Sequence, residues 1–157
     1  MLFRSTSDEP VVPDATENVD ISTSTEKNLK FGSFPDTIKS CTVTHPSTDV
    51  IENVNYHQYF NNNLSKNVPK TLDVQGEAYS NSLTQYAASV IGGATNSSGT
   101  YVQGKIHNLN MKIRGKIYGA AGNRDQDGGD ALWIKGNSQN RNINVEIESG
   151  GAVYAGG

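Results

Sequence analysis

Apolar and polar residues alternate over several short runs after about residue 37. This period places successive side chains on opposite faces, so each run predicts a half-buried β-strand. One strand should carry Cys41 and Val43 on one face, and a turn at residues 45–48 should lead into a second strand. A further strand is predicted over residues 70–79. The alternating positions of the second and third runs are Val50, Glu52, Val54 and Tyr56, then Leu72, Val74, Gly76 and Ala78.

One segment has helical spacing instead. Ser82 and Gln85 are placed as a capping box, and Gly92 is a stop signal. We therefore predict one short helix near residues 83–91, which would need tertiary packing because it is short. The apolar residues at the spacing of an amphipathic helix are Leu83, Tyr86, Ala87, Val90 and Ile91.

The C-terminal third contains an imperfect repeat. The segment "NLNMKIRGKIYGAAG" from Asn108 aligns with "NINVEIESGGAVYAGG" from Asn142, and two residues are inserted before the second tyrosine, Tyr154. Each copy has Asn-apolar-Asn, an alternating run, and then glycine, an apolar residue and tyrosine. Such units bury little surface alone and gain stability by stacking on copies or on symmetry mates.

These patterns divide the chain into three parts. Residues 1–36 are predicted to form an extended N-terminal arm, because Pro10, Pro13 and Pro35 interrupt regular pairing. A terminal tail without fixed structure is the alternative. Residues 37–100 are interpreted as a β-rich attachment and oligomerisation domain, and residues 101–157 as a glycine-rich β repeat region. Phe31 and Phe34 would anchor the arm on a neighbouring chain.

Composition also favours a mainly β fold. Charged residues make up only 18% of the chain, and most other polar residues are Ser, Thr, Asn and Gly, which suit strands and turns. The hydrophobic content of 34% is low for one compact core, so we expect oligomerisation, most simply a homotrimer. A net charge of -3 offers no basic stripe for nucleic acid. Membrane insertion is not expected either, since no apolar run approaches about 18 residues.

No catalytic constellation is evident. Cys41 is the single cysteine and lacks a surrounding motif, so a buried structural role is expected. His45 and His57 lie close in sequence but have no Cys, Asp or Glu at ligand spacing. The local motifs of nucleotide-binding, hydrolase and zinc enzymes are missing, so we expect no enzymatic activity and no cofactor.

The repeat region carries a resemblance to a known family. Its alternating strand, the turn "GKIYG", the segment "DGGDALWI" and the end "GGAVYAGG" resemble the glycine-rich C-terminal parts of tailed-bacteriophage tail-tip host-specificity and tail-fibre proteins, over about residues 104–157. The resemblance implies a β-rich region at the end of a trimer, in contact with a bacterial surface receptor. Ala120 and Ala121 depart from the family, in which a longer glycine run is common.

The resemblance implies a virion structural protein, made in the host cytoplasm, that attaches to other phage tail proteins and presents its glycine-rich end to the host. A virion adaptor, plug or decoration protein without receptor contact is the alternative. A depolymerase-like β-solenoid is disfavoured because the chain is short and has few repeats. The residues expected to contact a receptor or partner are Tyr118, Gly119, Asn123, Asp125, Asp127, Trp133, Tyr154 and Gly156.

The stretch that holds most of these residues has competing interpretations. Asp125, Asp127 and Asp130 do not fit an EF-hand, because Gly129 and Gly136 occupy positions that need acidic groups. No metal is assigned, although calcium loops outside that motif exist. A glycosidase carboxylate pair is a further alternative, and solvated Asp-Gly turns are the commonest use of such residues. An aromatic residue beside amide side chains, such as Trp133, packs in a core or presents a surface for a sugar.

Overall fold

The structure is a computed structural model that describes residues 12–25 and 32–157. Regular structure in this part consists almost entirely of short strands, which confirms the prediction of a mainly β fold. The helical elements of the described residues are one turn of α-helix, α1 (His57–Phe60), and a 3-10 turn, η1 (Asn61–Asn63).

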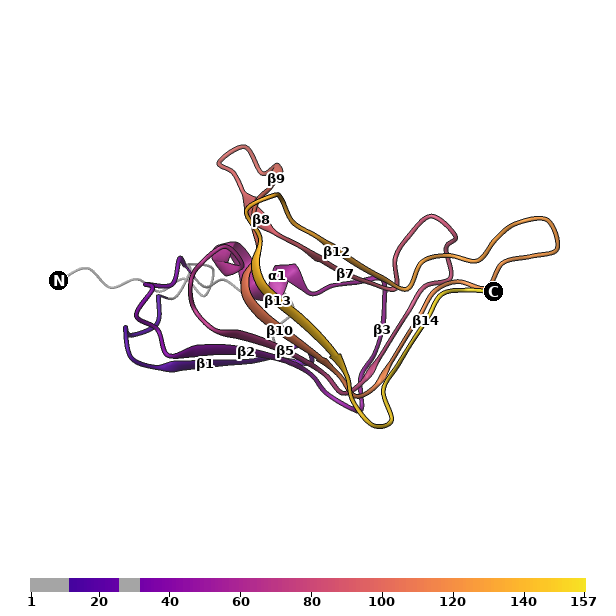
Figure 1. Cartoon of the computed structure of the whole chain (residues 1–157), viewed down its shortest axis with the longest axis horizontal. Coiled ribbons are helices and arrows are strands. Elements are labelled where there is room, and N and C mark those ends of the chain that lie inside the picture. The colour runs from indigo at the N-terminus through magenta and orange to yellow at the C-terminus, as the bar shows by residue number, and fades with distance from the viewer. Residues whose placement is uncertain (1–11, 26–31) are drawn as a thin grey trace.

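The described residues form three parallel sheets, and the chain passes through the three sheets in turn (Figure 1). The first sheet has the order β1-β2-β5-β10-β13, the second β3-β6-β11-β14 and the third β4-β7-β12. Successive coils therefore stack with one strand per sheet, an arrangement called a parallel β-helix, which is a β-solenoid. The short chain and the few sequence repeats, which weighed against a solenoid, do not prevent one. The strands are β1 (Asn18–Ser22), β2 (Ser40–His45), β3 (Val50–Glu52), β4 (Val54–Asn55), β5 (Lys70–Val74), β6 (Glu77–Tyr79), β7 (Ala88–Ile91), β10 (His107–Ile113), β11 (Lys116–Tyr118), β12 (Leu132–Lys135), β13 (Arg141–Ile147) and β14 (Ala152–Tyr154).

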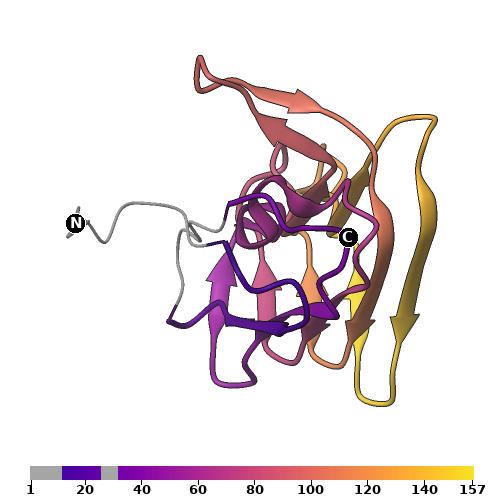
Figure 2. The same ribbon diagram turned by 90° about the vertical axis from the view of Figure 1, so that its left-hand side faces the viewer.

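Two insertions leave the third sheet before the next coil begins. The first is α1 with η1, which follows β4. The second is an antiparallel hairpin of β8 (Gly93–Thr95) and β9 (Tyr101–Gln103), which follows β7. The hairpin projects beyond the sheets in Figure 2. The two insertions lie side by side, because Asn62 Oδ1 accepts a hydrogen bond from the backbone N–H of Thr95 at 3.3 Å.

The core is built of columns of inward-facing side chains, one residue from each coil. In the first sheet, Val43 pairs with Leu72, Leu72 with Met111, and Met111 with Val145. Val43, Leu72 and Met111 are fully buried. Because the strands are parallel and in register, the two-residue period of each strand aligns its apolar positions with those of its neighbours. Cys41 and Val43 share the buried face that the sequence predicts.

The two strands around residues 45–48 do not form a hairpin. β2 and β3 belong to different sheets, and residues 46–49 form a corner between them. The corner also shifts the alternation, since Ile51 packs against the core while Val50 is 59% exposed. The predicted face is thus wrong for Val50 and Glu52, although Val54 and Tyr56 are buried as expected. The run over residues 70–79 is likewise divided by a corner into β5 and β6.

The helix predicted near residues 83–91 is wrong. Residues 88–91 form β7, the central strand of the third sheet, and the residues before it form turns. β7 pairs on both sides, with Ala88 opposite Val54 and Leu132. A short helix would form hydrogen bonds only within its own backbone. Strand pairing also supplies partners for the backbone N–H and C=O groups at the edges of β4 and β12. The short α-helix lies instead at α1, before the next coil.

The described part of the N-terminal arm packs on its own chain. β1 extends the first sheet by pairing with β2, and its Val19 and Ile21 are buried. Phe34 is 1% exposed and belongs to the core of this chain, so its predicted role as an anchor on a neighbour is wrong. Asn63 Oδ1 accepts a hydrogen bond from the backbone N–H of Phe34 at 2.7 Å. Phe31 and Pro10 lie outside the described residues.

The aligned segments of the C-terminal third lie next to each other. β10 pairs with β13, with Leu109 opposite Ile143, and β11 pairs with β14, with Tyr118 opposite Tyr154. The first and second sheets run without interruption across the predicted boundary at residue 100, since β5 pairs with β10 and β6 with β11. Residues 37–157 therefore share one continuous core.

Candidate functional site

The outer face of the third sheet carries a row of three side chains. Asn55, Ser89 and Trp133 lie opposite one another on β4, β7 and β12. They point outward, because their neighbours Val54 and Ala88 are buried on the other face. Ser89 Oγ donates to Asn55 Oδ1 at 2.9 Å, which fixes the amide of Asn55 beside the serine.

An aromatic pair stands next to this row. The ring centroids of Tyr86 and Trp133 are 4.5 Å apart, and the rings are nearly parallel at 17°. Tyr86 comes from the turn segment before β7, which is tied to the sheet where Asn53 Nδ2 donates to Gln85 Oε1 at 2.9 Å. Lys135 Nζ lies 4.9 Å from the Trp133 ring centroid, close enough for a cation–π interaction. Lys135 is exposed, so this flexible side chain leaves the surface accessible.

Two connected depressions surround the pair, and we call them together the Trp133 groove. One encloses about 260 Å³ and the other about 230 Å³, and both are lined by Thr84, Gln85 and Tyr86. Most lining side chains are neutral amides, hydroxyls and aromatics, with one carboxylate, Asp130. The remaining lining residues are Asn53, Asn55, Ser89, Ile91 and Trp133 in the first depression, and Leu83 and Asp130 in the second.

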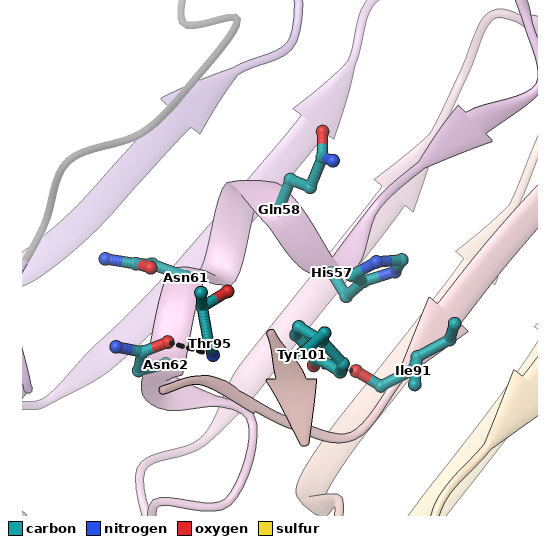
Figure 3. A pocket seen from close by; sticks show the side chains of 7 residues that line it. All are labelled: His57, Gln58, Asn61, Asn62, Ile91, Thr95 and Tyr101. Carbon is teal, nitrogen blue, oxygen red and sulfur yellow. Dashed lines mark hydrogen bonds between the residues drawn. The ribbon is translucent and has the colours of Figure 1, made fainter. Parts of the chain in front are cut away.

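A larger cavity of about 400 Å³ lies beyond Ile91, between α1, η1 and the β8–β9 hairpin (Figure 3). His57 is 8% exposed there, and its Nδ1 atom is enclosed without a hydrogen-bond partner in residues 12–25 and 32–157. Burial lowers the pKa of His57 below its usual 6.5, so the ring is neutral at pH 7. The Tyr101 ring lies 5.3 Å from the His57 ring. Burial raises the pKa of Tyr101 to about 12, and its hydroxyl donates to the Ile91 carbonyl at 2.5 Å.

The predicted contact residues of the glycine-rich end do not join the Trp133 groove. Tyr118 lies in the second sheet opposite Tyr79 and Tyr154, and the Tyr79 and Tyr118 rings stack with centroids 6.0 Å apart. Gly119 and Gly156 pack backbone against backbone: a Cβ on Gly119 would overlap the carbonyl of Gly129, and one on Gly156 would overlap that of Ala120. The close approaches that these glycines permit are therefore within the chain.

The acidic loop after Gly122 is an exposed turn. Asn123 Oδ1 accepts a hydrogen bond from the backbone N–H of Asp125 at 3.0 Å, and its Nδ2 donates to Gln126 Oε1 at 2.9 Å. Asp125 and Asp127 are exposed. Across residues 12–25 and 32–157, no three His, Cys, Asp or Glu side chains gather in a way that could hold a metal ion. The geometry is that of an Asx turn.

Of the predicted site residues, only Trp133 lies in the Trp133 groove. Sequence reasoning missed Asn53, Asn55, Gln85 and Tyr86, and it placed Tyr86 on a helix. Asn53 and Asn55 precede Tyr86 by about one coil and Trp133 by about two, and only the parallel register brings them together. The spacing of the coils along the sequence could have indicated that these residues lie together. Their register follows only once residues 88–91 are recognised as a strand.

The fold defines the chain as a parallel β-helix with polar, partly aromatic outer faces. No family model matches it, and neither the curated proteins nor the solved structures include a significantly similar one. No helix in the described residues is long and apolar enough to cross a membrane.

Proposed function

We propose that this chain is a bacteriophage tail component that binds a saccharide of the bacterial surface in the Trp133 groove. The observation that carries the proposal is the stacked pair of Tyr86 and Trp133 beside the amides of Asn53, Asn55 and Gln85. Aromatic rings pack on the apolar faces of sugar rings, and neutral amides donate to and accept from their hydroxyls. The assignment to a phage tail rests on the resemblance of residues 104–157.

The scaffold supports binding to a surface polymer. The groove lies on paired strands and is braced by the hydrogen bonds Ser89–Asn55 and Asn53–Gln85, so its polar groups are held in place before the ligand arrives. Such preorganisation reduces the entropy lost on binding. We propose binding and not hydrolysis, because Asp130 is the one carboxylate among the described residues that lines the groove, and glycoside hydrolysis commonly needs two.

A binding screen tests this proposal. The purified chain is applied to an array of bacterial O-antigen and capsular oligosaccharides, and the affinity for those bound is measured with Trp133→Ala and with Tyr79→Ala as the matched control. Tyr79 also belongs to an aromatic stack, but on the second sheet. We expect Trp133→Ala to weaken binding at least about ten-fold and Tyr79→Ala to leave it unchanged. Equal losses in both variants, or none in Trp133→Ala, would exclude the Trp133 groove.

A second candidate function is that of a virion adaptor, and it is favoured by the open end of the first sheet. Val145 and Ile147 occupy the inward columns of Met111 and Ile113, yet they are 41% and 58% exposed. Among the described residues, β13 is also the last strand of its sheet, so one edge of its backbone has no neighbouring strand there. An apolar surface beside an open strand edge is suited to strand addition by another protein. A chain that enters particles normally but binds no saccharide on the array would favour this role.

A further inference from the structure

The cavity beyond Ile91 continues the outer face that carries the Trp133 groove. Ile91 lines both the cavity and the groove, so the two depressions meet at this side chain. Ser89 lies opposite Asn55, and Ile91 follows Ser89 by two residues on β7, so Ile91 shares the face of Ser89. His57 lies just beyond the end of β4, at the start of α1, and lines the cavity together with Ile91.

The cavity is a polar site without charge. It is lined by His57, Gln58, Asn61, Asn62, Ile91, Thr95 and Tyr101. None of these side chains is a carboxylate, an ammonium or a guanidinium group, and the His57 ring is neutral at pH 7. A charged ligand would lose its hydration here without gaining a counter-charge, whereas a neutral polar ligand would exchange hydrogen bonds.

The His57 imidazole is the lining group with an unsatisfied buried nitrogen. His57 Nδ1 is enclosed and has no hydrogen-bond partner among the residues that the structure describes. A buried nitrogen without a partner is unfavourable, so a hydroxyl or amide that reaches it gains more than an exposed contact would. The nearby Tyr101 ring supplies an apolar face at 5.3 Å from the imidazole.

The walls of the cavity are fixed by the two insertions. The Tyr101 hydroxyl is held by the Ile91 carbonyl, and the backbone of Thr95 is held by Asn62 (Figure 3). The cavity volume of about 400 Å³ lies within the range of roughly 300–1,000 Å³ that is usual for small-molecule sites. One sugar unit fits these requirements, since it is neutral, carries hydroxyls all round and has an apolar ring face.

We propose that this cavity, the His57 pocket, is a second saccharide subsite that takes a neutral sugar unit linked to the one in the Trp133 groove. The inference rests on the proposed function, because it assumes that the groove binds a saccharide. It adds that the ligand is an oligosaccharide which passes Ile91, and that His57 Nδ1 bonds to a hydroxyl or acetamido group of its terminal unit.

Two spectroscopic reporters separate the subsites. Trp133 is the only tryptophan of the chain, so its fluorescence reports on the groove, while the imidazole NMR signals of His57 report on the pocket. The probe is a series of O-antigen fragments of increasing length. We expect Trp133 fluorescence to change with every length and the His57 signals to shift only with fragments longer than one sugar unit.

Two variants test the pocket by affinity. His57→Leu removes the unpaired nitrogen, and Gln58→Trp fills the pocket from an exposed position, so that it remains informative if His57→Leu does not fold. Both should weaken binding of the longer fragments at least about ten-fold and leave the shortest fragment unaffected. The Trp133→Ala variant should weaken all lengths.

The outcomes distinguish the two proposals. If Trp133 fluorescence responds to every fragment while the His57 signals stay fixed and both pocket variants bind normally, the His57 pocket is excluded and the Trp133 groove stands. If the His57 signals shift without any response from Trp133, the groove proposal fails and the pocket is a separate saccharide site. If neither reporter responds to any fragment, both proposals fail.

Discussion

Asn142 donates from its side-chain Nδ2 to Oδ1 of Asn108 at 2.8 Å, and both residues have a positive φ, of 55° and 52°. Asn108 in turn donates to Asn67 Oδ1 at 2.7 Å, so the side chains form a ladder across three coils. Asparagine tolerates this left-handed backbone better than other non-glycine residues. Its amide both donates and accepts, which lets identical residues link coil to coil.

The ladder predicts a stability difference between two asparagines of the same sheet. Asn108→Ala removes two side-chain hydrogen bonds and leaves alanine at a positive φ, so we expect the free energy of unfolding to fall by about 1–3 kcal/mol. Asn144→Ala is the matched control, since it removes one exposed hydrogen bond, to Asn110 at 3.1 Å. Urea denaturation of both variants gives the comparison. Equal and small losses would show that the ladder contributes nothing beyond ordinary surface contacts.

The packed glycines predict that substitutions in the glycine-rich end act through folding. A Cβ on Gly156 would overlap the carbonyl of Ala120, whereas a Cβ on Gly157 would meet nothing within 4 Å. We expect Gly156→Ala to cost about 1–3 kcal/mol and Gly157→Ala to cost nothing measurable. Thermal unfolding measures the difference. A Gly156→Ala protein with unchanged melting but lost adsorption to cells would instead place the glycine at a receptor contact.

Buried Lys70 predicts an unusual rise of stability at alkaline pH. Lys70 is 1% exposed, its Nζ donates to the carbonyls of Lys66 and Val68 at 2.6 and 2.7 Å, and burial lowers its pKa to about 8. The unfolded chain keeps this proton to about 10.5, so it binds more protons than the folded chain above pH 8. The free energy of unfolding should therefore rise from pH 8 to pH 9, by about 1 kcal/mol.

The measurement of Lys70 ends at pH 9 because Cys41 then acts in the opposite sense. Burial raises the pKa of Cys41 to about 12, so the unfolded chain loses this proton first, from about 9 upward, and the stability contribution falls. Denaturant titrations at pH 7, 8 and 9 are compared with those of Lys70→Met, whose stability should not rise. The same rise in Lys70→Met would assign the effect to another group.

The open end of the first sheet predicts association. We expect a solution mass above that of one chain, and the predicted homotrimer remains a prediction. The double variant Val145→Asp with Ile147→Asp should lower the mass. Both side chains continue the buried columns of the first sheet but are exposed in the single chain, and charges there oppose their burial against a second chain. Val102→Asp is the control, since Val102 is 52% exposed on the β8–β9 hairpin. Light scattering measures the masses. An effect of Val102→Asp alone would place the contact on the hairpin.

The stacked aromatics predict a coupling that precedes any ligand. Tyr86→Ala and Trp133→Ala should each destabilise the turn segment before β7, and their double-mutant cycle should give a coupling of about 0.5–1.5 kcal/mol. Urea denaturation of the two single variants and of the double variant supplies the cycle. Additive effects would show that the rings lie together without stabilising each other.

The alternation of apolar and polar residues by itself determined the strand content and the buried face of β2. The repeat in the C-terminal third left open whether its copies stack on each other or on symmetry mates, and the structure pairs them with each other. Met111 and Val145 lie at matching positions of two similar sequences, and they meet as neighbours in the sheet. Local patterns succeed here because a two-residue period needs no knowledge of distant residues. The same local signals placed a helix over residues 83–91, where the apolar spacing fits both periods.

Only the tertiary structure decided what residues 83–91 become and what lies beside Trp133. Val90 belongs to a strand because β4 and β12 lie on either side of it and their backbone groups need hydrogen-bond partners. Both of those strands are about one coil away along the sequence. Each corner also resets the alternation, as Val50 and Ile51 show, so no single period extends around a coil. The Trp133 groove and the His57 pocket combine residues from successive coils, and their proximity follows from the register of parallel strands, which the sequence of any one strand does not contain.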